Sequence, residues 1–175
     1  MKQLIVLITI FSFFFTGCKD NDPGDSDRNN IILITTHDID AAGASGFYFD
    51  FISGEETDST ASWHISFQML SVVGTTYKMP NLVLGDVSIS EYTNLSYDDI
   101  TSTPETFQND NIQDLSVLQY GGASEVLAYD MQIHKVSVSN AERVFIIHEP
   151  INDTTYKIQF IEYISGITTF KYDAL

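Results

Sequence analysis

The sequence predicts one all-β domain, an antiparallel β-sandwich-like fold with a C-terminal β-meander and a few short helical pieces. Aromatic and β-branched residues are abundant, and no segment has a clear helical period. Short apolar segments alternate with turn signals about every dozen residues. This combination is typical of β-sandwiches and related all-β architectures.

Three strands and a further apolar run are expected in the first half of the chain, and two of the strands have informative faces. Residues 31–36, four aliphatic residues followed by two threonines, predict a buried strand, and residues 54–58 predict a turn. In the segment 47–51 three phenylalanines share one face, opposite Tyr48 and Asp50. The segment 63–69 alternates with period two. Its inward face is expected to hold Trp63, Ile65, Phe67 and Met69, and its outward face His64, Ser66 and Gln68. A further apolar run at 82–89 is interrupted by Gly85 and Asp86.

The second half begins with a polar connection and ends in strands. Residues 90–114 hold Pro104 and several aspartates and predict turns or short helical pieces, and Gly121-Gly122 predicts a sharp break. A strand pair is expected at 126–129 and 133–138. The segment 143–148 predicts a strand buried on both faces, and short turns connect it to strands at 156–163 and 167–172. These last three strands form the predicted meander.

The N-terminus predicts export and lipid attachment. One lysine precedes an apolar run, residues 4–15, which is shorter than the roughly 20 residues needed to span a bilayer and matches the core of a signal peptide. The segment 15–18, Phe-Thr-Gly-Cys, resembles a bacterial lipobox, so Cys18 is the expected lipidation site. The predicted organisation is a signal peptide over 1–17, a flexible acidic tether over 18–30 and the all-β domain over 31–175. The expected location is the outer membrane, with the domain on its periplasmic or external face.

Charge and motifs exclude several classes of function. The net charge is −16, with 24 acidic and 8 basic residues, and such a field repels the phosphates of nucleic acids. The sequence has no Gly-x-Ser-x-Gly, His-Glu-x-x-His or phosphate-loop motif, so we do not expect an enzyme. Asp98-Asp99 and Asp110/Asp114 do not complete a calcium-loop pattern, which favours a solvated acidic loop.

The order of the aromatic strands resembles the HmuY family of haem-binding bacterial lipoproteins. The resemblance rests on Gly-Phe-Tyr-Phe-Asp at 46–50, Trp-His-Ile-Ser-Phe at 63–67, Tyr-Lys-Ile-Gln-Phe at 156–160 and Thr-Phe-Lys-Tyr at 169–172. It covers most of the domain, from about residue 46 to residue 172. It implies an all-β fold, haem or porphyrin held between two projecting loops, and often two axial ligands from histidine or methionine. It also implies a possible partner, an outer-membrane transporter that receives the haem.

The haem ligands implied by this resemblance must come from a small set of methionines and histidines. Met131, Met79 and His134 are the favoured candidates, because they fall in loop-like segments or beside the predicted strand pair. Met131 and His134 are expected on opposite faces of a strand, so that only one would face a given ligand. Ordinary packing or exposure stays open for all three. Core packing is preferred for Met69, backbone bonding at a strand end for His148, and a surface position for His64, while His37 is regarded as incidental. Four tyrosines could stack on a porphyrin: Tyr92, Tyr97, Tyr120 and Tyr129.

Two functions follow from these observations. The first is a lipid-anchored, haemophore-like protein that captures haem for uptake. The alternative is a non-haem surface lipoprotein of the same fold that binds a protein or glycan partner. The segment 78–81, Lys-Met-Pro-Asn, differs from the family pattern and favours the alternative.

The predicted processing can be tested directly on the mature protein. We expect mass spectrometry of the protein from bacterial membranes to find an N-terminus at Cys18 that carries acyl chains. Several chains anchor a protein durably, because each buried methylene contributes ~0.8 kcal/mol. A mature chain that retains Met1 and an unmodified thiol would contradict the predicted anchor.

Overall fold

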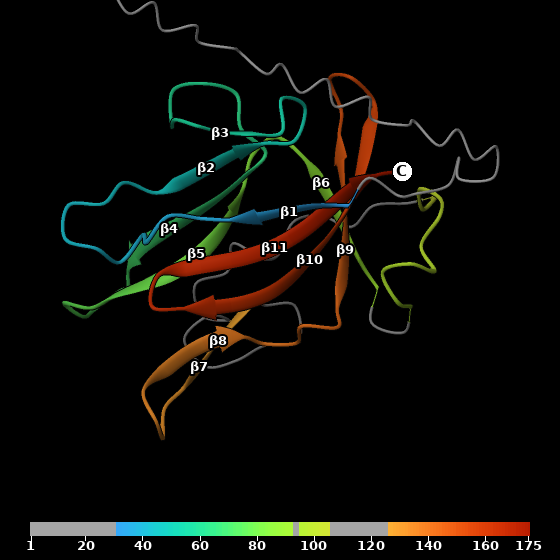
Figure 1. Cartoon of the computed structure of the whole chain (residues 1–175). Coiled ribbons are helices and arrows are strands. Elements are labelled where there is room, and N and C mark those ends of the chain that lie inside the picture. The colour runs from blue at the N-terminus through green and yellow to red at the C-terminus, as the bar shows by residue number, and fades with distance from the viewer. Residues whose placement is uncertain (1–30, 93–94, 106–125) are drawn as a thin grey trace, which may run out of the picture.

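The architecture is two antiparallel sheets packed face to face, with a separate two-stranded hairpin beside them (Figure 1). The computed structural model describes residues 31–92, 95–105 and 126–175. Across these ranges the chain forms eleven β-strands and no helix. The predicted all-β, sandwich-like fold is therefore confirmed, whereas the expected short helical pieces do not form among the described residues.

The larger sheet has five strands in the order β1-β11-β10-β9-β6. Their bounds are β1 Ile32–Thr35, β6 Ser88–Tyr92, β9 Val144–Glu149, β10 Thr154–Ile164 and β11 Ile167–Ala174. The last three pair antiparallel in sequence order, which confirms the predicted C-terminal meander. The expectation that the 143–148 strand is buried on both faces is also confirmed, because four successive apolar residues of β9, Val144 to Ile147, are all buried.

The smaller sheet has four strands in the order β3-β2-β4-β5. Their bounds are β2 Phe47–Asp50, β3 Glu55–Thr57, β4 Ile65–Ser71 and β5 Lys78–Leu84. The remaining strands, β7 Leu127–Asp130 and β8 Lys135–Val138, pair only with each other, as the sequence predicted for this part of the chain.

Aromatic rings from the two sheets form the core. The inward phenylalanines of β2 and β4 meet rings of β10 and β11, with ring centroids 5.5 Å apart for Phe49 and Phe170 and 5.8 Å apart for Phe67 and Phe160. Both pairs are close to perpendicular, the edge-to-face arrangement that aromatic pairs favour. The predicted alternation of residues 47–51 is thus confirmed.

The outer face of the larger sheet is covered by residues 95–105. Tyr97 and Ile100 pack on Val144 and Ile146 of β9. Lys157 of β10 is buried there, and its Nζ donates to the carbonyl oxygens of Tyr97 and Ile100 at 3.2 and 3.1 Å. A buried ammonium needs such partners, so these bonds tie the connection to the sheet.

Four expectations about the first half of the chain were wrong. Residues 31–36 do contain a strand, but β1 is an edge strand with an exposed Leu33, because only one neighbour pairs with it. The predicted turn at 54–58 contains β3, and the chain reverses just before it. His64 and Ser66 are buried rather than outward in water, and Trp63 is only half-buried. The segment 78–81, expected as a loop, is the first half of β5.

Several predicted features lie outside the described residues. They are the signal peptide, Cys18 and the tether, together with the Gly121-Gly122 break, Tyr120 and the aspartates 110 and 114. Among the residues that are described, there is no helix with the length and apolar character needed to cross a bilayer.

The buried tyrosines predict a loss of stability in alkali. Burial, helped by the nearby Asp40 carboxylate, raises the pKa of Tyr163 to about 12, from an ordinary value of 10.0. Burial also raises the pKa of Tyr97, Tyr156 and Tyr172. In the unfolded chain these phenols ionise near pH 10, while the folded protein keeps them neutral. Their contribution to the free energy of unfolding is therefore complete below pH 10 and is lost as the pH rises towards 12.

We expect denaturant midpoints to fall steeply over that interval. In Tyr163→Phe, which has one phenol fewer to titrate, the fall should be shallower. An equal slope in the variant would show that Tyr163 does not contribute.

Candidate functional site

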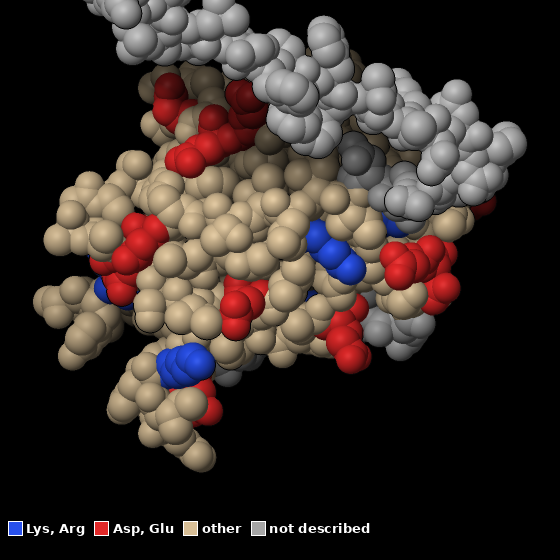
Figure 2. Space-filling model, viewed as in Figure 1, with Lys and Arg blue, Asp and Glu red and all other residues tan. Residues whose placement is uncertain are grey.

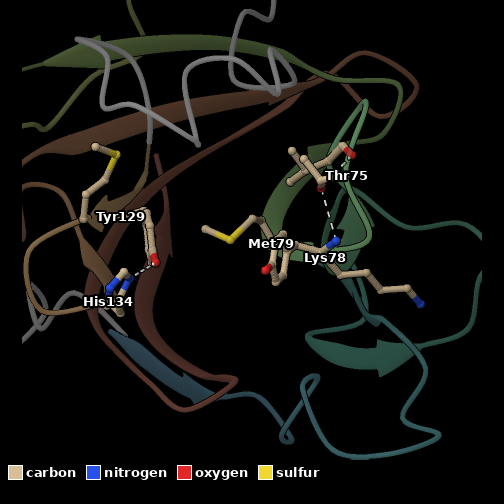
Figure 3. Close-up of a pocket in the computed structure, with 8 residues that line it drawn as sticks. Thr75, Lys78, Met79, Tyr129 and His134 are labelled. Carbon is tan, nitrogen blue, oxygen red and sulfur yellow. Dashed lines mark hydrogen bonds between the residues drawn. The ribbon is translucent and has the colours of Figure 1, made fainter.

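The candidate site is a cavity of about 460 Å³ between the β4–β5 hairpin and the β7–β8 hairpin, here called the hairpin cavity. Its volume lies within the range of small-molecule pockets, roughly 300–1,000 Å³. The two hairpins form opposite walls (Figure 3). Its lining comprises Val72, Thr75, Tyr77, Lys78 and Met79 from the first hairpin, and Tyr129, Met131 and His134 from the second.

The β4–β5 hairpin positions Met79. Leu70 of β4 pairs with Met79 of β5, and the turn beyond them is closed by the Val72 N–H, which donates to the Tyr77 carbonyl at 3.0 Å. Gly74 occupies the turn with φ 79°, a left-handed conformation that glycine adopts without steric cost. Successive strand residues point to opposite sides, so Met79 points into the cavity while the Lys78 side chain points away from it (Figure 3).

The β7–β8 hairpin positions the opposite wall. Asp130 pairs with Lys135, and the Asp130 carboxylate accepts the backbone N–H of Gln132 at 2.7 Å, which shapes the four-residue turn between them. Met131 opens this turn and is 62% exposed, and His134 closes it. His134 has φ 52°, the left-handed region, which costs an L-residue about 1 kcal/mol or more. Glycine would adopt this conformation without that cost, so the imidazole occupies this position at the expense of some backbone strain.

Tyr129 holds the imidazole of His134. The Tyr129 Oη and His134 Nδ1 atoms lie 2.7 Å apart, within hydrogen-bonding distance (Figure 3). When Nδ1–H donates to the phenol oxygen, Nε2 presents its lone pair elsewhere. Histidines that ligate metals usually have one nitrogen bonded in this way, which fixes the ring and its tautomer.

The structure brings together the three residues favoured from the sequence. Met79, Met131 and His134 all line the hairpin cavity. The expectation that Met131 and His134 lie on opposite faces of a strand was wrong, because both belong to the turn between β7 and β8, where strand alternation does not apply. Both can therefore face one ligand.

The other sequence candidates lie elsewhere. His64 is buried, and its Nδ1 accepts the Phe51 N–H at 3.1 Å and lies 3.1 Å from an Asp50 carboxylate oxygen. His148 lies in β9, near the end of the strand, with its Nδ1 3.4 Å from the Thr155 hydroxyl. His37 contacts Glu56 at 3.0 Å. Met69 packs against the core, in agreement with the expectation.

Of the tyrosines expected to stack on a ligand, Tyr129 lines the cavity, whereas Tyr97 is buried on the outer face of the larger sheet. The sequence analysis missed Tyr77, Val72 and Thr75. The available signal was the period-two spacing of Thr75, Tyr77 and Met79, which Val72 does not share. In the described ranges, no group of three His, Cys, Asp or Glu side chains is placed to hold a metal ion, and this includes Asp98 and Asp99.

The chemistry of the hairpin cavity fits a planar apolar ligand that carries a metal. Thioether sulfur and imidazole nitrogen are both donors that haem iron accepts. Met79 supplies one from the β4–β5 wall, and Met131 and His134 supply two from the β7–β8 wall. Tyr77, 74% exposed, and Tyr129 add aromatic surface at this site. The residues present therefore offer donors from two sides and apolar contact between them.

No protein-family model matches the chain, and no curated protein matches it either.

The strained backbone at His134 predicts a separation of stability from binding. In His134→Gly we expect the free energy of unfolding to stay within about 1 kcal/mol of wild type, because relief of the left-handed strain offsets the greater chain entropy of glycine. The imidazole is lost in the same variant, so any ligand that depends on it should bind more weakly. Chemical denaturation measures the first effect. Destabilisation well beyond that range would show that the histidine serves the fold.

Proposed function

We propose that this protein is a lipid-anchored haem-binding protein that captures haem or a related porphyrin in the hairpin cavity for uptake. One observation carries the proposal. Met79 lines the cavity from one hairpin, and Met131 and His134 line it from the other. These side chains are the donor types that iron porphyrins take. Convergence of such donors from two projecting hairpins is also what the resemblance to the HmuY family implies.

Six of the eight lining residues have a role in this proposal. Met79 binds the iron from the β4–β5 side, and either Met131 or His134 binds it from the β7–β8 side. The Tyr129 hydroxyl orients the His134 ring, and Tyr77 and Val72 contact the apolar macrocycle. Haem, as the cargo, supplies an iron with axial positions that these donors can occupy.

The openness of the site supports capture and release. Met131 and Tyr77 are largely exposed, so a ligand can enter without displacing the core. The lipid anchor at Cys18 would hold the domain beside an outer-membrane transporter that receives the haem. Haem can leave an open cavity while few contacts within the protein are broken. This property suits a carrier better than an enzyme.

The alternative function is binding of a protein or glycan by a surface lipoprotein without haem. Exposed apolar side chains at the two hairpin tips favour it, since Val73 is 86% exposed and Ile133 67% exposed. Exposed apolar side chains gathered in one region can mark an interaction site. The two functions differ in whether the protein binds haem on its own.

Titration with haemin tests the proposal. We expect one equivalent of haemin to give a shifted Soret band in the wild type. Met79→Ala should weaken binding at least tenfold, because about 1.4 kcal/mol of ligand stabilisation corresponds to that factor. Met131→Ala and His134→Ala should differ from each other, and the more damaging variant identifies the second ligand.

His37→Ala is the matched control, because His37 lies outside the hairpin cavity. This variant should bind haemin as the wild type does. An unshifted Soret band in the wild type at equimolar haemin would overturn the proposal and favour the alternative.

A further inference from the structure

A second cavity adjoins the hairpin cavity and has a different character. Its volume is about 290 Å³, and it shares Lys78, Met79 and His134 with the hairpin cavity. Its other walls include Met69 and Pro80 of the smaller sheet, Lys135 and Val136 of β8, Asp40, and the turn between β10 and β11. We call it the lysine cavity. One ligand could therefore occupy both cavities at once, with its donor-bound part at Met79 and His134.

The lysine cavity holds two basic side chains that make no ion pair within the part of the chain that the structure describes. Five of the eight basic residues fall in the described ranges. Lys157 is buried and donates to two carbonyl oxygens. Arg143 is buried, and its guanidinium lies 2.9 Å from the Ser139 hydroxyl. The Nζ atom of Lys171 lies 4.1 Å from the centroid of the Tyr97 ring.

The remaining two are Lys78 and Lys135. Both are exposed and both line the lysine cavity. No described residue forms an ion pair with either ammonium. They come from the two hairpins that also supply the candidate iron ligands, and the Lys78 side chain is directed to the other side of its strand from Met79 (Figure 3). Two free positive charges gathered beside one cavity are notable on a chain of net charge −16.

The charge of the surrounding surface favours anion binding at these two lysines over other positions. In the face drawn in Figure 2, acidic patches outnumber basic ones, and one of the basic patches lies over the β7–β8 hairpin. A negatively charged ligand is repelled by most of this surface, so an anionic group can be stabilised only where cations are concentrated. Asp40 also lines the lysine cavity and opposes an anion there.

We propose that the lysine cavity is a carboxylate-binding subsite, in which Lys78 and Lys135 bind the carboxylate edge of the porphyrin held in the hairpin cavity. The inference rests on the proposed function and names its substrate class: an amphipathic porphyrin with acidic side chains. Such a molecule has a largely apolar macrocycle and two carboxylates on neighbouring positions of one edge. The apolar part matches the methionine and tyrosine lining, and the acidic edge matches the lysine pair.

The test compares haemin with haemin dimethyl ester, in which both carboxylates are masked, in one detergent-containing buffer. We expect the wild type to bind haemin about tenfold more tightly than the ester. Lys78→Gln and Lys135→Gln should each weaken haemin binding about threefold, the effect expected of an exposed charge pair, and leave the ester unaffected. Asp40→Asn should strengthen haemin binding. Lys171→Gln is the matched control, because Lys171 lies outside both cavities and should change neither ligand.

The outcomes separate this inference from the function on which it rests. If the wild type binds neither ligand, the proposed function fails and the subsite fails with it. If the wild type binds haemin and the ester equally, or if the double variant Lys78→Gln/Lys135→Gln retains the preference for haemin, the subsite is wrong while haem binding stands. Circular dichroism of each variant shows whether it is folded, and a preference measured between two ligands on one folded protein does not depend on changes in overall stability.

Discussion

A layer of phenylalanine and tyrosine rings holds the two sheets together, and every other feature of the domain depends on it. The rings of Phe49, Phe170 and Tyr172 lie within 6.5 Å of one another, measured between centroids, and they come from both sheets. Large aromatic side chains bury much apolar surface and pack in edge-to-face pairs. No disulfide can contribute, because the chain has a single cysteine, so the aromatic layer carries the association of the sheets.

This layer also determines where the candidate site lies. The smaller sheet contributes β4 and β5, whose far ends extend past the aromatic layer as a hairpin. The β7–β8 hairpin belongs to neither sheet and packs mainly against β10. The space between these two hairpins is therefore lined by side chains that the core does not need, and these include two methionines and a histidine. Residues that are free of core packing can be selected for their chemistry.

The site differs from the core in its tolerance of strain and exposure. Core residues are buried and lie in strands of regular conformation. At the site, His134 adopts a left-handed backbone conformation, and Met131 and Tyr77 expose most of their surface. A local cost of this kind persists where the surrounding structure supports it, and it is often associated with function. The buried Lys157 on the other face of the domain shows the contrasting case, a polar group whose partners are all internal and whose role is to hold a connection in place.

The sequence by itself determined the strand-forming segments and most of their faces. In the segment 47–51 and in the C-terminal meander, the alternation of apolar residues and the short turns are local properties, and strand geometry converts them directly into an inside and an outside. Tertiary structure decided which strand lies at an edge, so that the apolar β1 is exposed, and which polar residues are covered, so that His64 and Ser66 are buried. It also decided that Met79 meets Met131 and His134 at one cavity. Met79 is far in the chain from the other two, and their meeting depends on how the β4–β5 hairpin packs relative to the β7–β8 hairpin, which no local pattern encodes.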